Sequence, residues 1–130
     1  MAYIYIVRCD DDSLYTGITK DIEKRIKNHA QGKGPSHAKY MRSHKPVEIM
    51  ALWQTDDYKV AAKLEYAIKR VKRSQKLILI EKPDSVGEMF PQLSDFEFAC
   101  VDGITLEKVL AIGKNENNIK NDENNNKKTP

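Results

Sequence analysis

Cysteine and long apolar runs are scarce in this 130-residue chain. The two cysteines, Cys9 and Cys100, are too few for a disulfide framework or a zinc site, and they are typical of reduced thiols in a cytoplasmic protein. No apolar run approaches the ~20 residues that a membrane span needs, and residues 10–12, all Asp, interrupt any secretory signal segment. The sequence therefore predicts a small cytoplasmic domain with a modest core.

Acidic residues are sparse in the first part of the chain. Residues 1–83 carry 17 Lys and Arg against 10 Asp and Glu, a net charge of +7, whereas residues 84–130 carry 5 against 9, a net charge of −4. Residues 20–45 hold 8 basic and only two acidic residues. A basic lobe of this kind attracts polyanions through its field and through counterion release. The same pattern is also typical of an ordinary solvated surface.

The chain opens with the pattern of a β-hairpin that leads into a helix. Residues 3–9 are aromatic and β-branched, which favours a strand. Residues 10–13 read Asp-Asp-Asp-Ser, whose short polar side chains bond their own backbone in turns. Residues 14–19 form a second short strand pattern, so the segment is expected to fold back on itself.

The hairpin admits two registers. If Val7 opposes Tyr15, then Tyr5, Tyr15 and Gly17 share one face, because paired residues point to the same side of a sheet. If Cys9 instead opposes the first residue of the second strand, the two tyrosines point to opposite faces. The residues alone leave both registers open.

Two helices are predicted by apolar residues at helical spacing. The first is capped by Thr19 or Asp21 and ends at Gly32. Arg25 and His29 lie four residues apart on one flank of its apolar stripe. That flank is expected to look along the edge of the sheet.

A third strand and a stronger helix follow. Residues 47–55 have the strand pattern, and Asp56 or Asp57 caps a helix that runs to about Lys72. Glu65 lies on the rim of the buried stripe of this helix, where a carboxylate can lean over a sheet edge. The pattern indicates an α+β fold: a small three-stranded antiparallel or mixed sheet with an N-terminal hairpin, flanked by helices.

Composition divides the chain into three parts. Residues 1–83 form the predicted domain, which ends with a helical stretch capped by Ser74. Residues 84–113 are predicted to be a short helical extension whose apolar side chains dock either on the domain or on a partner. Residues 114–130 contain seven Asn and four Lys around one apolar residue, which predicts disorder.

Several short motifs occur in a fixed order within residues 1–83. They are Tyr3-Ile4-Tyr5, Tyr15-Thr16-Gly17, Arg25, His29, Gly32-Lys33-Gly34, Pro46-Val47, Glu65 and Ile68-Lys69-Arg70. In this order and spacing they resemble the GIY-YIG endonuclease superfamily, and more closely its small stand-alone bacterial members. The first motif departs from the superfamily pattern, since Tyr3 stands where Gly is usual. The resemblance favours the α+β fold and the register in which the two tyrosines share a face.

The resemblance implies an endonuclease that hydrolyses phosphodiester bonds with a divalent metal. Glu65 would hold Mg²⁺ or Mn²⁺, which accept oxygen ligands and keep several waters. Arg25 would offer a planar fork to the phosphate. Tyr15 would be the general base, oriented by Tyr5, with His29 as a second candidate base. Because a phenol titrates near pH ~10, Tyr15 would need a nearby cation, either Arg25 or the metal, to lower its pKa.

Contacts to DNA, and possibly RNA, are expected from backbone and basic positions. Gly17 would let a backbone approach closely. In residues 32–46, basic residues interleaved with an aromatic suit a nucleic-acid strand. A second basic ridge is formed by Lys69, Arg70, Lys72, Arg73 and Lys76, and its residues are either phosphate contacts or ordinary surface charge. The candidates are Gly17, Lys33, Tyr40, Arg42, Lys69, Arg70 and Arg73.

Two departures keep other functions open. Many superfamily nucleases carry an Asn about a dozen residues after the metal-binding Glu, whereas residues 76–80 here read Lys-Leu-Ile-Leu-Ile. No attached targeting module is recognised either, which favours weak sequence preference. The alternatives are a nucleic-acid-binding module that cleaves poorly or not at all, and an adaptor that binds a protein partner through residues 84–113.

Overall fold

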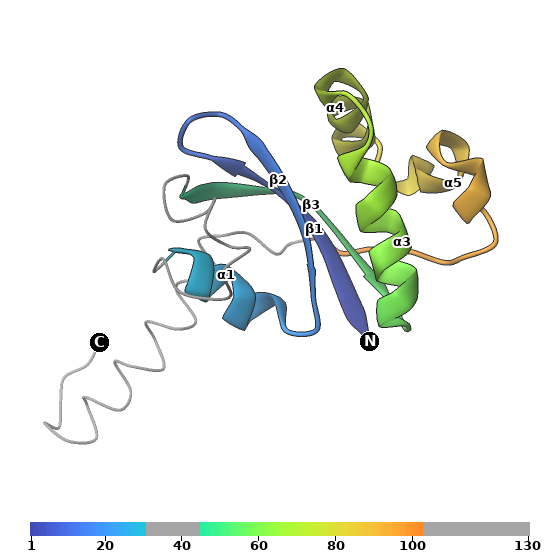
Figure 1. Ribbon diagram of the computed structural model, residues 1–130, viewed down its shortest axis with the longest axis horizontal. Helices are drawn as coiled ribbons and strands as arrows, with labels where there is room; N and C mark the ends of the chain where they lie inside the picture. The colour runs from blue at the N-terminus through green and yellow to red at the C-terminus, as the bar shows by residue number, and fades with distance from the viewer. Residues whose placement is uncertain (31–44, 103–130) are drawn as a thin grey trace, which may run out of the picture.

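The computed structural model describes residues 1–30 and 45–102. These residues form an α+β fold in which an antiparallel sheet lies between helices (Figure 1). The strand order is β2-β1-β3-β4, so the N-terminal strand is central and the second strand forms one edge.

The first two strands, β1 (Ala2–Cys9) and β2 (Leu14–Thr19), form the predicted hairpin. Val7 pairs with Tyr15 and Tyr5 pairs with Gly17, which confirms the register in which the tyrosines share a face. The turn between the strands places Asp12 at φ 71°, a left-handed conformation that Asp tolerates better than most residues. The Cys9 N–H donates to the Ser13 carbonyl across the turn at 2.8 Å.

The sheet has four strands, and the expectation of three was one too few. The third strand, β3 (Pro46–Thr55), pairs antiparallel with β1 as expected. The additional strand, β4 (Ala99–Cys100), pairs with the outer side of β3. A two-residue strand lacks a recognisable sequence pattern, because alternation needs at least four residues to be visible.

Alternate residues of β1 supply two separate cores. Ile4 and Ile6 point to the face covered by α3 (Tyr58–Lys69), where they pack with Leu64 and Ile68. All four of these side chains are fully buried. Burying one such side chain contributes roughly 1.5–3 kcal/mol, so this layer fixes α3 on the sheet.

The opposite face of the sheet is covered by α1 (Ile22–Ala30). Tyr5 and Val7 of β1 pack there with Ile22 and Ile26. The start of α1 is fixed as predicted by its cap: the backbone N–H of Lys24 donates to the Asp21 carboxylate at 3.1 Å. The two faces of one central strand therefore carry the two helices that bear Arg25 and Glu65.

The later helices begin and end at other residues than expected. Asp57 caps α3 as predicted, but α3 ends at Lys69. The next helix, α4 (Arg73–Glu81), begins before Ser74, so that residue does not cap it. Instead the side-chain oxygen of Gln75 accepts a hydrogen bond from the Lys72 backbone N–H at 3.3 Å, which stabilises the first turn.

The segment after α4 returns to the sheet. It contains η2 (Pro83–Ser85), α5 (Val86–Met89) and η3 (Pro91–Leu93). Val86, Phe90 and Leu93 are buried in the same cluster as Trp53, whose indole N–H donates to the Pro83 carbonyl at 2.7 Å. This part of the extension thus docks on the sheet and its helices. The division of the chain at residue 83 stays a prediction, and the tail 114–130 lies outside the described residues.

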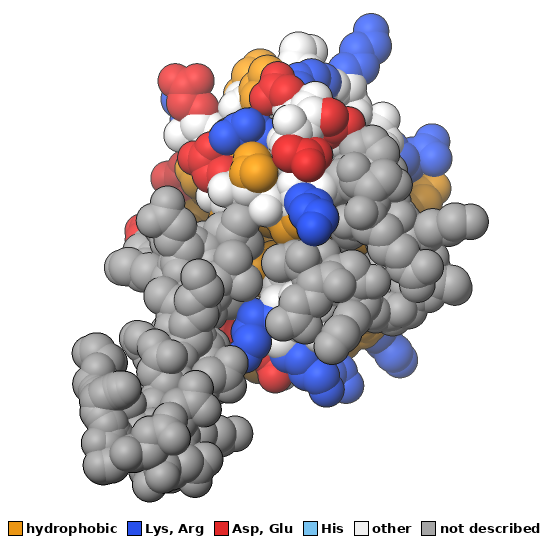
Figure 2. Space-filling model, turned by 90° about the vertical axis from the view of Figure 1, so that its left-hand side faces the viewer, with side chains coloured by type: hydrophobic (Ala, Val, Ile, Leu, Met, Phe, Trp, Pro, Cys, Tyr) orange, Lys and Arg blue, Asp and Glu red, His pale blue; other side chains and the backbone are white. Residues whose placement is uncertain are grey.

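The described surface carries both signs of charge. Figure 2 shows Lys, Arg, Asp and Glu side chains interleaved on one face of the molecule. Much of the predicted basic lobe, residues 31–44, lies outside the described part of the chain. Within the described part, no helix combines the length and apolar character needed to span a bilayer.

Candidate functional site

The hairpin register places two phenols next to each other. The ring centroids of Tyr5 and Tyr15 are 6.3 Å apart and the ring planes are tilted by 36°. This spacing is within the range of favourable aromatic pairs. Tyr5 lies on the central strand and Tyr15 on the edge strand, so only Tyr15 can reach the rim of the sheet.

Gly17 is the partner of Tyr5 across the hairpin, and the Tyr5 side chain occupies the space above it, which leaves no room for a larger residue. A Cβ atom at Gly17 would lie 2.5 Å from the Tyr5 hydroxyl oxygen and 2.6 Å from Cζ, closer than side-chain atoms can approach. Tyr5 is 0% exposed, and it lies beneath the site instead of lining it. In this geometry Tyr5 packs beneath the pocket, and its predicted catalytic role stays a prediction.

A polar pocket of about 290 Å³ opens at the β2 edge, where α1 and α3 approach from opposite faces of the sheet. The side chains and backbone that line it come from β2, α1 and α3. They are Tyr15, Gly17, Ile18, Arg25, Tyr58, Glu65 and Lys69. Three predicted catalytic or metal-binding residues and two predicted nucleic-acid contacts, Gly17 and Lys69, therefore meet here.

An ion pair forms one wall of the pocket. The Lys69 ammonium lies 3.2 Å from the Glu65 carboxylate, one helical turn away on α3. The same ammonium lies 5.9 Å from the centroid of the Tyr15 ring, and the Lys20 ammonium lies 5.5 Å from that of Tyr58. Two lysine ammonium groups thus lie close to the Glu65 carboxylate and to two phenol rings.

Burial dominates the titration of both phenols. It raises the pKa of Tyr15 above its usual value; Arg25 opposes this shift, whereas Glu65 adds to it. Burial, followed by the neighbouring Tyr15, raises the pKa of Tyr5 still further, again against Arg25. The expectation that Arg25 lowers the pKa of Tyr15 is right in sign, but Arg25 does not outweigh burial. Tyr15 is therefore protonated at neutral pH in this state.

Two lining residues were not among the predicted site residues. Tyr58 lies seven residues before Glu65, which is two turns of α3, so helical spacing contained a signal for it. Ile18 follows Gly17 on the edge strand and points to the α3 side of the sheet. Nothing in the type of an isoleucine marks it as part of a site.

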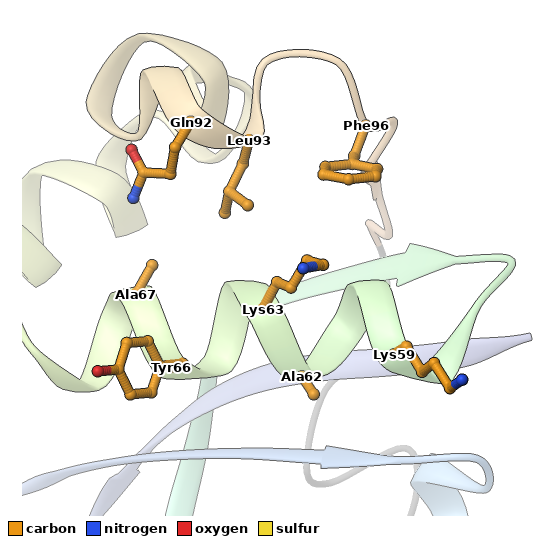
Figure 3. A pocket seen from close by; sticks show the side chains of 8 residues that line it. All are labelled: Lys59, Ala62, Lys63, Tyr66, Ala67, Gln92, Leu93 and Phe96. Carbon is orange, nitrogen blue, oxygen red and sulfur yellow. The ribbon is translucent and has the colours of Figure 1, made fainter.

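A larger hollow of about 700 Å³ lies elsewhere, between α3 and the segment that includes η3 (Figure 3). It is lined mainly by apolar or aromatic side chains, including Tyr66, Leu93 and Phe96, together with Lys59 and Lys63. Of the predicted site residues whose side chains the structure describes, none lines it. Size alone would favour this hollow, but the smaller pocket brings together a carboxylate, a guanidinium and two phenols.

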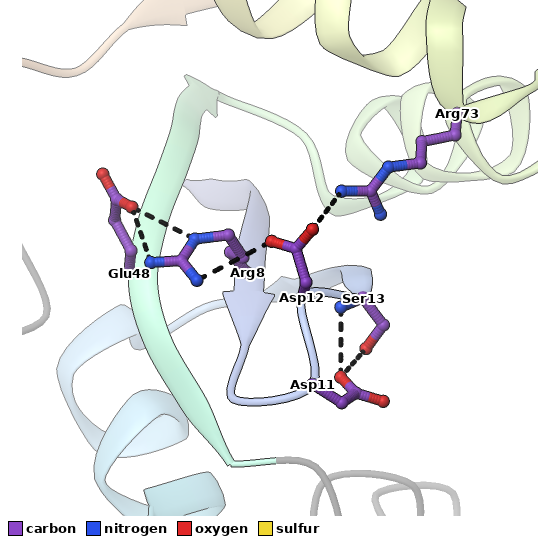
Figure 4. A network of polar contacts seen from close by, with 6 residues as sticks. All are labelled: Arg8, Asp11, Asp12, Ser13, Glu48 and Arg73. Atoms are coloured by element: carbon purple, nitrogen blue, oxygen red, sulfur yellow. Dashed lines mark hydrogen bonds and ion pairs between the residues drawn. The ribbon is translucent and has the colours of Figure 1, made fainter.

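Some predicted contacts lie away from the pocket. Arg73 forms an ion pair with Asp12 of the hairpin turn at 3.3 Å (Figure 4). Arg70 donates to the Tyr66 hydroxyl at 3.1 Å on the exposed side of α3. Their role as phosphate contacts stays a prediction. The side chains of His29, Lys33, Tyr40 and Arg42 lie outside the described residues.

The donor set fits a cation that is shared with a substrate. Among the described residues, no three His, Cys, Asp or Glu side chains are grouped as they would be in a protein-only metal site. Of the described residues that line the pocket, Glu65 alone carries a carboxylate. Mg²⁺ is commonly held by one or two carboxylates together with substrate phosphates and waters, so one half-buried Glu is sufficient.

Comparison with known proteins gives a consistent result. A family model described as the GIY-YIG catalytic domain matches residues 1–77. A UPF0213 protein of Fusobacterium nucleatum is 43% identical over 83 residues, which cover 64% of this chain and 80% of that protein. A UPF0213 protein of Staphylococcus saprophyticus is 49% identical over 80 residues, or 62% and 94% of the two chains. The solution NMR structure of a UPF0213 protein from Bacillus halodurans is 35% identical and covers 69% of this chain and 97% of its own, with a TM-score of 0.41.

Proposed function

Because the chain belongs to the GIY-YIG catalytic domain family, in which nuclease activity with divalent metals is general, we propose that it is an endonuclease. Its substrate is DNA, and it hydrolyses phosphodiester bonds with a divalent cation and weak sequence preference. One observation carries the proposal: Tyr15, Arg25 and Glu65 come from three separate elements and line one pocket. A phosphodiester at that point meets an acid, a guanidinium and a phenol together.

Arg25 binds the scissile phosphate in this proposal. Its planar guanidinium can donate two parallel hydrogen bonds to phosphate oxygens and remains charged at all relevant pH values. The Arg25 side chain is half-buried, and Tyr5 packs against α1, the helix that carries Arg25. Holding the guanidinium in place before the substrate arrives lowers the reorganisation needed to stabilise the charge that develops on the phosphate.

Tyr15 handles a proton at its hydroxyl oxygen. With its pKa raised, the phenol enters the reaction protonated and donates a hydrogen bond to a phosphate oxygen or to the attacking water. To act as the base, it must lose that proton, and Arg25 alone does not provide enough positive charge for this at neutral pH. The Tyr5 ring, which occupies the space over Gly17, packs beside the Tyr15 ring and supports it at the rim.

Glu65 is the residue that would hold the cation. A divalent cation supplies positive charge to the phosphate oxygens and an ordered water close to them. Contacts limited to phosphate, cation and water carry no sequence information. This is the basis for proposing weak sequence preference.

The test compares Glu65→Gln with Glu81→Gln, since Glu81 is an exposed carboxylate on α4 that lies outside the pocket. Supercoiled plasmid is incubated with each protein and Mg²⁺, with and without a chelator. We expect the wild type and Glu81→Gln to nick the plasmid only with Mg²⁺, and Glu65→Gln to lose on the order of 10²-fold or more in rate. Equal rates for the two variants would mean that the nicking comes from another site or from a contaminant.

A second function is favoured by the raised pKa of Tyr15 and by the occupied carboxylate of Glu65. In that alternative the chain binds nucleic acid and cleaves it poorly. Binding would then be independent of Mg²⁺, would weaken steeply with salt, and would be unchanged in Tyr15→Phe. Nicking by the wild type that Tyr15→Phe abolishes would exclude this alternative.

A further inference from the structure

We propose that Lys69 blocks cation binding at Glu65 until substrate is present. The Lys69 ammonium pairs with the Glu65 carboxylate, an arrangement that we call the reserved state, until a phosphodiester attracts the ammonium away, so that cation and nucleic acid bind cooperatively. This inference rests on the proposed function and adds a mode of regulation to the same pocket. Lys69 is a positioning residue in this role, because it acts on the cation through Glu65.

The contacts of Lys69 define the reserved state. Its ammonium is 3.2 Å from the Glu65 carboxylate, at the place where a cation would otherwise be held. A divalent cation and an ammonium cannot share that carboxylate without strong repulsion, because like charges a few ångströms apart repel. Metal binding therefore requires Lys69 to leave.

The charge of the pocket sets the order of binding. Arg25 and Lys69 contribute two positive charges to the described lining and Glu65 contributes one negative charge. The Lys20 ammonium above the Tyr58 ring adds a further positive charge at the rim. A pocket with net positive charge attracts a phosphodiester and disfavours a dication, so the anion is expected to prepare the site for the metal.

The ion pair is weak enough to be exchanged. The Lys69 side chain is 51% exposed and the Glu65 side chain 22%, so solvent reaches the pair, and pairs of this kind one helical turn apart contribute little to stability. The lysine stem is flexible and its ammonium is a point charge, so it can pivot from a carboxylate to a phosphate. Its neighbours on the same ridge, Arg70 and Arg73, are engaged with Tyr66 and Asp12 instead and do not line the pocket.

The experiment measures two affinities for the full chain: that for Mn²⁺, by calorimetry without nucleic acid, and that for a short labelled DNA duplex, by anisotropy in a chelator. The variants are Lys69→Met, Lys69→Arg and, as a matched control, Lys63→Met, an exposed lysine of α3 outside the pocket. We expect Lys69→Met to bind Mn²⁺ roughly two- to fivefold more tightly, the gain that removal of a weak competing pair allows. The same variant should bind the duplex more weakly.

Opposite changes in the two affinities are what identify the reserved state. Lys69→Arg keeps the competing charge, so it should bind Mn²⁺ no more tightly than the wild type, and Lys63→Met should leave the Mn²⁺ affinity unchanged. An unchanged or weaker Mn²⁺ affinity in Lys69→Met would overturn the inference.

Glu65→Gln separates the two proposals. If Glu65→Gln loses Mn²⁺ binding while Lys69→Met binds Mn²⁺ like the wild type, the metal site stands and the role of Lys69 falls. If Glu65→Gln binds Mn²⁺ normally, the proposed metal site itself is wrong, and the inference about Lys69 falls with it.

Discussion

Gly17→Ala tests the packing beneath the site. The added Cβ would lie 2.5 Å from the Tyr5 hydroxyl oxygen and 3.0 Å from Cε1, roughly an ångström inside ordinary contact distance. Tyr5 cannot yield easily, because its ring is 0% exposed. Overpacking of this kind costs about 1–3 kcal/mol, so we expect the Tm to fall by at least about 4 °C in calorimetry or circular dichroism.

Gly87→Ala is the matched control for this prediction. A Cβ there would meet Ser94 at 3.6 Å, an ordinary contact, and Gly87 lies within the helix α5. Alanine should leave stability unchanged or raise it by about 0.4–1 kcal/mol. Tyr5→Phe in the Gly17→Ala background removes the nearest atom but leaves Cζ at 2.6 Å, so only part of the loss should be recovered. An unchanged Tm in Gly17→Ala would refute the placement of the Tyr5 ring over Gly17.

Three further variants test other parts of the structure. Because burial raises the pKa of Tyr5, its neutral form stabilises the fold below pH ~10, and this stability is lost as the pH rises further. In urea titrations, Tyr5→Phe should therefore reduce the loss of unfolding free energy above pH ~10, whereas substitution of the exposed Tyr66 by Phe should not. Arg25→Lys keeps the charge but loses the planar fork, so the nicking rate should fall on the order of 10²-fold with little change in Tm. Asp57→Ala removes the acceptor of the Lys59 N–H at 2.8 Å and should lower the unfolding free energy by about 1 kcal/mol. It should not change the ratio of nicking rates between pocket variants such as Arg25→Lys and their parent protein.

The elements of the fold were largely predictable from the sequence. Aromatic and β-branched runs identified β1 and β3, and capping aspartates identified the starts of α1 and α3. The hairpin register needed the resemblance, because three consecutive aspartates do not reveal which one adopts the left-handed conformation that Asp12 has. The pairing of β4 with β3 was missed, because two residues carry no periodic pattern.

Five of the seven described residues that line the candidate pocket were named from the sequence, but the distances between them were not predictable. Helical spacing placed Arg25 on a flank of α1 and Glu65 on the rim of α3, yet the meeting of two helices from opposite faces of a sheet depends on the tertiary packing of both cores. The ion pair between Glu65 and Lys69 could have been read from their spacing of four residues. Its consequence for metal binding could not, because it depends on which charges line the pocket.

The two halves of the pocket differ in how firmly they are held. Tyr15 and Arg25 lie above a layer in which Tyr5 fills the space over Gly17, so their positions are set by packing that a single methyl group would disturb. Glu65 belongs to a rigid helix, but its partner is a half-exposed lysine whose contact is easily exchanged. In the proposed mechanism, the half that would bind phosphate is therefore prepared in advance, whereas the half that would bind the cation depends on a charge that can move. A nuclease whose pocket is divided in this way would bind DNA before it binds its metal. Hydrolysis would then occur only in pockets that already hold DNA.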